Sequence, residues 1–161
     1  MNDSKIVEGA IAPAFTLADT HGVKVKLSEF KGQYVVIYFY PKDDTPGCTK
    51  EACGFRDLSK EFEQLNAVVL GISPDEGPSH EKFIKKYDIP FTLLCDPNKS
   101  VMEKYAAWGE KNMYGKITIG TIRSTVLVGP DGKIIKHWKK VTKADQHPSK
   151  VKEVIEKHQH A

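Results

Sequence analysis

Cysteine is scarce in this chain of 161 residues, which holds three. Three is a small and odd number, which does not suit a structural disulfide framework. Each thiol is therefore expected to take part in chemistry, bind a metal or simply be buried. The Cys-x-x-Cys motif of thiol–disulfide exchange enzymes is missing. The six histidines contain no His-x-x-x-His pair. This argues against a zinc site of Cys48, Cys53 and one histidine, although the cysteine spacing alone leaves that site open.

Long apolar runs, a basic block and a signal-peptide pattern are also absent. The 24 Lys and Arg residues and 21 Asp and Glu residues are spread along the chain, so we expect no nucleic-acid partner. The start, Met-Asn-Asp-Ser-Lys, lacks the basic and apolar stretches of a signal peptide, and no apolar run reaches the length of a membrane span. We therefore expect a cytoplasmic protein with no membrane contact, folded as one domain over residues 1–161.

Apolar periodicity predicts an α/β fold. Residues 34–40 and 67–72 are typical of strands covered on both faces, and helical spacing over 55–65 between them indicates a parallel βαβ unit. Further patterns predict a hairpin of 15–17 and 24–27, a helix at 82–87, a strand at 91–94, a helix at 101–108 introduced by Asp96-Pro97, a hairpin of 125–128 and 133–138, and a helix at 151–158. This order predicts a thioredoxin-like fold, a central mixed β-sheet flanked by helices with an N-terminal β-hairpin extension. The order alone also fits other α/β folds.

The segment 41–53 leaves the end of the central strand and enters the first helix. Ligands of open α/β sheets gather at that end of the strands. Cys48 is expected in the first helical turn, where unpaired N–H groups and the helix dipole favour an anion. With one nearby cation, its thiol would be largely ionised, and the thiolate is the reactive form. A buried structural cysteine is the alternative, but the surrounding loop is polar and glycine-rich.

The spacing of Pro41, Thr45 and Cys48 reproduces the Pro-x-x-x-Thr-x-x-Cys motif of peroxiredoxins. The chain around this motif resembles the peroxiredoxin Q subfamily, also called bacterioferritin comigratory protein, at residues 9–17, 45–57, 89–94 and 123–125. The resemblance implies a thiol-dependent peroxidase that reduces hydrogen peroxide and organic hydroperoxides without a cofactor or metal. It also implies a monomer that is recycled by thioredoxin or a similar dithiol reductant.

The resemblance implies a role for each matching residue. Cys48 would be the peroxidatic cysteine, Thr45 would accept a hydrogen bond from one peroxide oxygen, and backbone N–H groups near Gly47 and Cys48 would donate to the other. Pro41 would shield the thiolate from water. Arg123 would stabilise the thiolate and the charge that develops as the O–O bond breaks. Taken alone, Thr45 would be a helix cap and Arg123 a surface arginine.

Peroxide attack leaves a sulfenic acid on Cys48, which a second thiol must capture before over-oxidation. Cys53 is the nearest candidate, and the resemblance implies that it is the resolving cysteine of an intramolecular Cys48–Cys53 disulfide. On an ideal helix, residues five apart have Cα atoms about 8.7 Å apart, whereas a disulfide tolerates roughly 7 Å. The helix is therefore expected to unwind locally in each cycle. Cys53 could instead be a packing residue, and Cys95, at a strand end, is assigned no catalytic role.

Two other functions use the same residues. A general thiol–disulfide oxidoreductase would keep the fold but reduce insulin, and the missing Cys-x-x-Cys motif argues against it. A peroxide-responsive redox sensor would undergo the same oxidation without turnover. Steady peroxide consumption coupled to a thioredoxin system separates an enzyme from a sensor.

Overall fold

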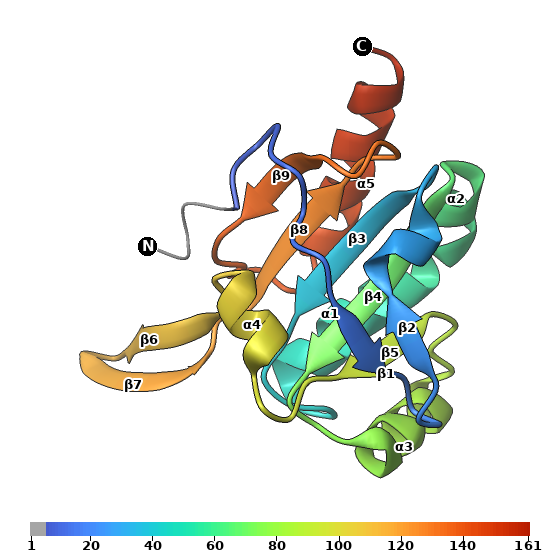
Figure 1. The fold of residues 1–161 in the computed structure, drawn as a ribbon. Helices are drawn as coiled ribbons and strands as arrows, with labels where there is room; N and C mark the ends of the chain where they lie inside the picture. The colour runs from blue at the N-terminus through green and yellow to red at the C-terminus, as the bar shows by residue number, and fades with distance from the viewer. Residues whose placement is uncertain (1–5) are drawn as a thin grey trace.

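The computed structural model describes residues 6–161, apart from the side chain of Met113 (Figure 1). The start Met-Asn-Asp-Ser-Lys, in which no signal-peptide pattern was found, lies outside the described residues. The strands are β1 (Thr16–Ala18), β2 (Lys24–Lys26), β3 (Tyr34–Phe39), β4 (Ala67–Ser73), β5 (Thr92–Cys95), β6 (Trp108–Met113), β7 (Lys116–Thr121), β8 (Ser124–Val128) and β9 (Ile134–Trp138). The helices are the short 3₁₀ helix η2 (Leu27–Phe30) and the α-helices α1 (Pro46–Asp57), α2 (Ser59–Gln64), α3 (Gly77–Tyr87), α4 (Ser100–Lys104) and α5 (His147–Gln159).

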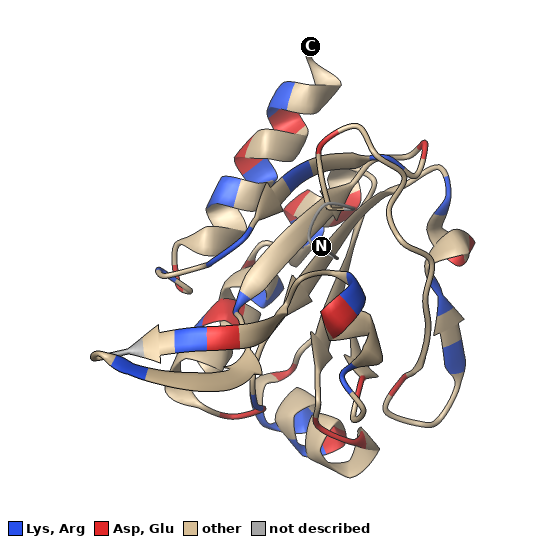
Figure 2. Ribbon diagram, turned by 60° about the vertical axis from the view of Figure 1, so that its left-hand side comes forward, with Lys and Arg blue, Asp and Glu red and all other residues tan. Residues whose placement is uncertain are grey.

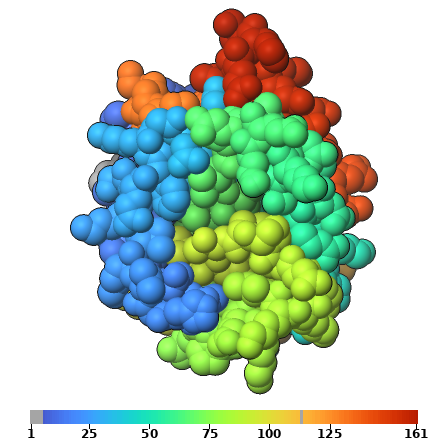
Figure 3. Space-filling view, turned by 90° about the vertical axis from the view of Figure 1, so that its right-hand side faces the viewer, coloured from blue at the N-terminus to red at the C-terminus, as the bar shows by residue number. Residues whose placement is uncertain are grey.

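Seven strands form one mixed sheet in the order β2-β1-β5-β4-β3-β8-β9. The strands β3, β4 and β5 run parallel, whereas β8 and β9 continue the sheet antiparallel. At the other edge, β1 and β2 form the expected N-terminal hairpin, and Ala18 pairs with Cys95 of β5. Figure 3 shows this blue N-terminal segment against the yellow-green segment that contains β5. The prediction of a mixed sheet flanked by helices, with a hairpin extension, is confirmed.

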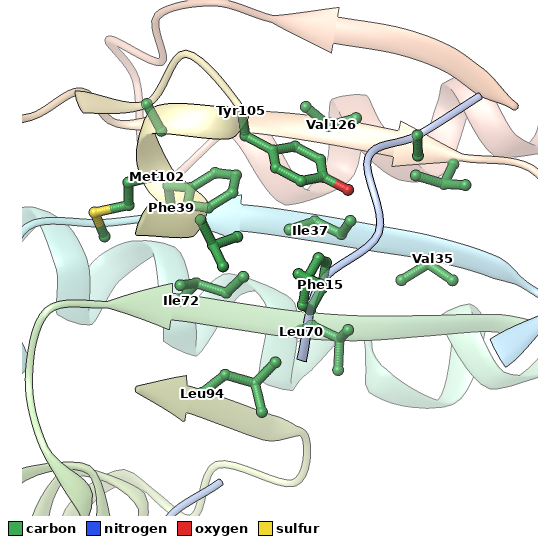
Figure 4. Packing of buried hydrophobic residues seen from close by; sticks show 14 of the residues in the cluster. Phe15, Val35, Ile37, Phe39, Leu70, Ile72, Leu94, Met102, Tyr105 and Val126 are labelled. Carbon is green, nitrogen blue, oxygen red and sulfur yellow. The ribbon is translucent and has the colours of Figure 1, made fainter. Parts of the chain in front are cut away.

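Strand β3 is buried along its whole length, so its side chains feed two cores. On one face, Ile37 and Phe39 pack with Phe15 of the N-terminal segment and with Met102 and Tyr105 at α4 (Figure 4). On the other face, the apolar side chains of α1, α2, α3 and α5 cover the sheet. A fully buried side chain of this size contributes about 1.5–3 kcal/mol, which explains why an apolar run without alternation makes a central strand.

The region after β5 differs from the predicted helix at 101–108. The helix α4 begins at Ser100 and ends at Lys104, and Ala106 then takes a left-handed conformation with φ of 57°. Asp96 does not begin the helix, yet its carboxylate accepts the N–H of Met102 at 2.9 Å and so caps it from a distance. After Ala106 the chain enters the hairpin of β6 and β7, which was not predicted and which projects from the body of the molecule in Figure 1.

Other boundaries shift by less. The predicted helical stretch 55–65 is two helices, since the backbone at Leu58 departs from helical geometry between α1 and α2. Apolar spacing does not register such a break because Leu58 still packs on the same face. The helix α3 begins five residues before the predicted 82–87, at Gly77 and Pro78, and α5 begins at His147. Proline near each helix start has φ already suited to a first turn.

Charges are mixed over the molecule, with lysines interspersed among glutamates along α5 (Figure 2). Within residues 6–161, every helix is too short or too polar to cross a membrane. The ends of β3, β4 and β5 open on one edge of the sheet, where the loop into α1 begins.

Candidate active site

Cys48 lies where the sequence predicts it, in the first turn of α1. The helix starts at Pro46, and Thr45 occupies the N-cap position with an extended backbone. The N–H of Thr49 donates to the Thr45 carbonyl at 2.8 Å, so the N–H groups of Gly47 and Cys48 precede the first helical bond and belong to those that a helix leaves unpaired. The Cys48 side chain is 1% exposed. Its sulfur is thus held near N–H dipoles that favour an anion.

Arg123 reaches the same sulfur from the far end of the chain. The strand β8 runs antiparallel to β3, and Ser124 pairs with Phe39, so the residue before β8 lies beside the loop that follows β3. The Nη2 atom of Arg123 donates to Cys48 Sγ at 3.2 Å, and the N–H of Val141 donates to the Arg123 carbonyl at 2.8 Å. Arg123 therefore contacts Cys48 and is not a free surface arginine.

Glu51 completes the group, although the sequence interpretation gave it no role. Its Oε1 accepts a hydrogen bond from Arg123 Nη1 at 2.8 Å, and its side chain is fully buried. Burial raises the pKa of Glu51 to about 7, against the opposing attraction of Arg123. The pKa of Arg123 is raised because Glu51 and Cys48 outweigh the effect of its own burial. An acidic residue three positions after Cys48, on the buried helix face, was the signal that could have identified Glu51.

Because Gly47 has no side chain, Arg123 has space to contact both Cys48 and Glu51. A Cβ atom built on Gly47 would lie 3.0 Å from Arg123 Nη2. The close approach of Arg123 to position 47 favours glycine there, because a side chain would press on the guanidinium.

Thr45 and Pro41 lie in the segment that leads from β3 into α1. The hydroxyl of Thr45 does not cap the helix; it donates to the Lys42 carbonyl at 3.0 Å. Because its hydrogen is used in this way, the oxygen keeps lone pairs that can accept a hydrogen bond. Pro41 and Arg123 both line an open cleft of about 730 Å³, together with residues of β6 and the loop after β9. The unpredicted hairpin thus forms one wall of the cleft beside the site.

Cys53 lies on α1 with Cys48, as the sequence predicts, and both are free thiols. Cys53 is partly exposed whereas Cys48 is buried. The next residue, Gly54, packs on α5 so closely that a Cβ atom would meet Pro148 Cγ at 2.8 Å. The two cysteines are therefore five residues apart on one intact helix, a spacing of about 8.7 Å between Cα atoms.

Cys95 lies at the end of β5, away from these groups. It is 8% exposed, and its Sγ is 3.8 Å from the Asp19 carbonyl oxygen. Burial raises the pKa of the Cys95 thiol to about 11. A thiol that stays protonated is a poor nucleophile.

A set of potential metal ligands converges at the same edge of the sheet. The donor atoms of Asp43, Asp75 and His80 lie within 4.8 Å of one another. Within residues 6–161, three or more potential metal ligands converge only here, and this group contains neither Cys48 nor Cys53. The structure does not gather the cysteines and a histidine into the zinc site considered above.

Comparison with known proteins identifies the family of the chain. Residues 9–137 match the model of the AhpC/TSA family. Peroxiredoxin Bcp of Bacillus subtilis is 47% identical over 137 residues, which cover 85% of this chain and 87% of that protein. A putative peroxiredoxin bcp of Coxiella burnetii is 48% identical over 143 residues, which cover 89% and 94%.

Solved structures agree with this placement. The bacterioferritin comigratory protein of Xanthomonas campestris, described for its alkyl peroxide reduction activity, superposes with a TM-score of 0.83 at 38% identity, covering 89% of this chain and 91% of that chain. A mutant of Xylella fastidiosa PrxQ has a TM-score of 0.88 at 34% identity, covering 96% and 98%. The fold is thus the thioredoxin-like fold of these peroxiredoxins, and the chain belongs to the AhpC/TSA family as a thiol peroxidase of the peroxiredoxin Bcp and Q group.

Proposed function

We propose that Cys48 is the peroxidatic residue and that Thr45, Arg123 and Pro41 assist it. The observation that carries this proposal is the contact between Arg123 Nη2 and Cys48 Sγ at 3.2 Å, at the N-terminus of α1. A guanidinium and a helix N-terminus both favour a sulfur that carries negative charge. Such a thiolate attacks one oxygen of a peroxide, the O–O bond breaks, and an alcohol or water leaves.

The surrounding donors and acceptors suit the charge that develops in this step. Thr45 can accept the hydrogen bond of the peroxide, since its own hydrogen is bonded to Lys42. The N–H groups of Gly47 and Cys48 and the guanidinium of Arg123 can donate to the oxygen that leaves. Glu51 holds the guanidinium at 2.8 Å and so sets its direction. Preorganised donors of this kind need no rearrangement as the bond breaks.

We propose Cys53 as the resolving residue. Its thiolate attacks the sulfur of the Cys48 sulfenic acid, an S–S bond forms, and the S–O bond breaks with release of water. The Cα spacing of about 8.7 Å on an intact helix exceeds the roughly 7 Å of a disulfide. The first turns of α1 therefore unwind before the bridge closes.

We propose organic hydroperoxides and hydrogen peroxide as substrates and thioredoxin or a similar dithiol as the reductant. The open cleft of about 730 Å³ beside Arg123 has room for the organic part of a hydroperoxide. A cytoplasmic location would supply such a reductant. The monomer expected from the resemblance stays a prediction, which sedimentation velocity of the reduced and oxidised protein tests.

Thiol titration and two variants test the mechanism. One equivalent of peroxide should remove two free thiols from the wild-type protein. Cys48→Ser should abolish peroxide reduction, whereas Cys53→Ser should consume one equivalent and stop at the sulfenic acid, which mass spectrometry detects after trapping with a dione. Cys95→Ser is the matched control and should keep full turnover with thioredoxin. Full activity in Cys48→Ser would refute the assignment, and an unchanged thiol count would refute the two-cysteine cycle.

A further inference from the structure

His80 and Asp43 form a buried pair beside the active site. His80 is the fourth residue of α3 and is fully buried, and Asp43, which is 8% exposed, lies in the loop 41–45 between β3 and α1. The Nδ1 atom of His80 is 2.7 Å from Asp43 Oδ2. Because the loop 41–45 contains Pro41 and Thr45 and leads directly to Cys48, a contact that holds Asp43 also holds the start of α1.

The hydrogen bonds of this pair use both nitrogens of the ring. The Nε2 atom of His80 is 3.0 Å from the Leu94 carbonyl oxygen, which can only accept, so this nitrogen carries a hydrogen. The Asp43 carboxyl group accepts the hydroxyls of Tyr40 at 2.6 Å and Ser79 at 2.8 Å, and its Oδ2 atom faces Nδ1 of the ring. Both ring nitrogens therefore face an oxygen, so His80 links Asp43 to the end of β5.

The potential metal ligands at this edge are occupied by one another. Besides the three donors to Asp43, the Oδ2 atom of Asp75 accepts the Asp43 N–H at 2.7 Å and the Ser73 hydroxyl at 2.8 Å. A metal ion would have to break this network and displace the ring proton of His80. The arrangement is a closed set of hydrogen bonds whose effect is to fix the loop.

A second contact ties the same loop to the other end of α3. Asp44 accepts the Lys86 ammonium at 2.8 Å and the Tyr87 hydroxyl at 2.8 Å. The side chains of Lys86 and Asp44 are 59% and 41% exposed, so water weakens this contact. The buried contact has no such competition, and loss of one partner would leave buried polar atoms of the other without a hydrogen bond. The contact at His80 is therefore the stronger of the two.

We propose that His80 is a positioning residue that holds the loop 41–45 in the conformation that receives peroxide and opposes the unwinding that disulfide formation requires. The proposal rests on the function proposed above for Cys48 and Cys53. Unwinding the first turns of α1 frees the residues that follow the loop. While His80 holds Asp43, this segment has a fixed end and fewer unwound conformations, so it unwinds less often. The same contact keeps Thr45 in place for peroxide.

The two chemical steps should respond in opposite directions when the contact is weakened. In His80→Asn the side-chain amide can still donate to Asp43, but the bond to Leu94 is lost. Loss of one buried hydrogen bond corresponds to about a tenfold change in an equilibrium. We expect sulfenic acid formation to slow by about tenfold and disulfide formation to accelerate by up to about tenfold. The fraction of Cys48 over-oxidised to sulfinic acid per turnover should fall accordingly.

Each step is measured separately. Sulfenic acid formation is followed in the Cys53→Ser background by quenched-flow trapping with a dione, and disulfide formation is followed with both cysteines present by rapid thiol alkylation and mass spectrometry. Ser79→Ala removes one hydrogen bond to the same Asp43 carboxylate and should shift both rates in the same directions by less. It decides the question if His80→Asn does not fold. Lys85→Ala, which breaks an exposed ion pair with Glu81 on α3, is the matched control and should change neither rate.

Opposite changes in the two rate constants support the proposal. Any other pattern overturns it, including a proportional fall of both rates, which a merely structural role of His80 would produce. Failure of the proposed function is distinct, because the wild-type protein would then form neither the sulfenic acid nor the disulfide.

Discussion

Glu51 should lower the stability of the protein as the pH rises from about 4.5 to about 7. Burial raises the pKa of its carboxyl from 4.5 to about 7. Because the folded pKa lies above the unfolded one, the folded protein keeps a proton that the unfolded chain has released. The contribution to stability is therefore complete below the unfolded pKa and is lost as the pH rises through the folded pKa.

The variant Glu51→Gln isolates this effect because an amide does not titrate. One pKa unit corresponds to about 1.4 kcal/mol, so from about pH 5 to about pH 8 the variant should gain roughly 2–3 kcal/mol over its parent. The comparison with the parent is necessary because His147 acts in the opposite sense. Burial lowers the pKa of His147 from 6.5 to about 4, so its contribution to stability is lost as the pH falls through that window. The effects of Glu51 and His147 have opposite signs over part of this pH range. The free energy of unfolding of the parent protein therefore changes less with pH than either effect alone would predict.

Urea unfolding at several pH values measures the difference. Both proteins carry Cys48→Ser, which removes the thiol next to Arg123, and both are kept reduced. The free energy of unfolding of Glu51→Gln minus that of the parent should rise steadily with pH. A difference that stays constant from about pH 5 to about pH 8 would refute the reasoning, because Glu51 would then be ionised throughout and its attraction to Arg123 would outweigh burial.

Three further substitutions test the packing and charge of the site. Gly47→Ala should press on Arg123, because its Cβ would lie 3.0 Å from Nη2. We expect kcat/KM for peroxide to fall about tenfold. The free energy of unfolding should change by less than about 1 kcal/mol, since alanine favours the helix. Arg123→Lys keeps a charge but loses the planar fork whose two nitrogens bond Cys48 and Glu51 separately, so peroxide reduction should slow by about a hundredfold in single-turnover assays. Gly71→Ala places a Cβ 2.7 Å from a methyl group of Leu93 and should cost about 1–3 kcal/mol in urea unfolding with unchanged peroxide kinetics in the folded protein.

Two predictions that depend on local sequence are confirmed. The run at 34–40 is a buried strand because its neighbours on both faces are apolar, and Pro46 and Gly47 begin a helix that places Cys48 in its first turn. These features need no knowledge of distant residues. The roles proposed for Cys48, Cys53, Thr45, Arg123 and Pro41 stay predictions.

Contacts between distant residues could not be read from the sequence. The family motif indicated Arg123, but its contact with Cys48 depends on the register between β3 and β8. The pair of Asp43 and His80 joins residues 37 positions apart, and nothing near either residue marks the partner.

The hairpin of β6 and β7 was missed for another reason. Its apolar side chains face outward, with Ile117 64% and Ile119 71% exposed. Residues 116–121 do alternate apolar with other residues, but their partner strand at 108–113 is largely polar and shows no such pattern, so the sequence does not mark a pair of strands.

The contact between Gly54 and Pro148 divides α1 into two halves that differ in how firmly they are packed. The second half, with Cys53, is clamped to α5, whereas the first half is held by side-chain contacts that can release. In the proposed disulfide step, the Cys48 sulfur would then travel and the Cys53 sulfur would stay near its starting point. The closed bridge would therefore lie near the partly exposed Cys53, which is not among the residues that line the cleft beside Arg123. The reductant would then meet the bridge at Cys53, outside the cleft that is proposed to hold peroxide.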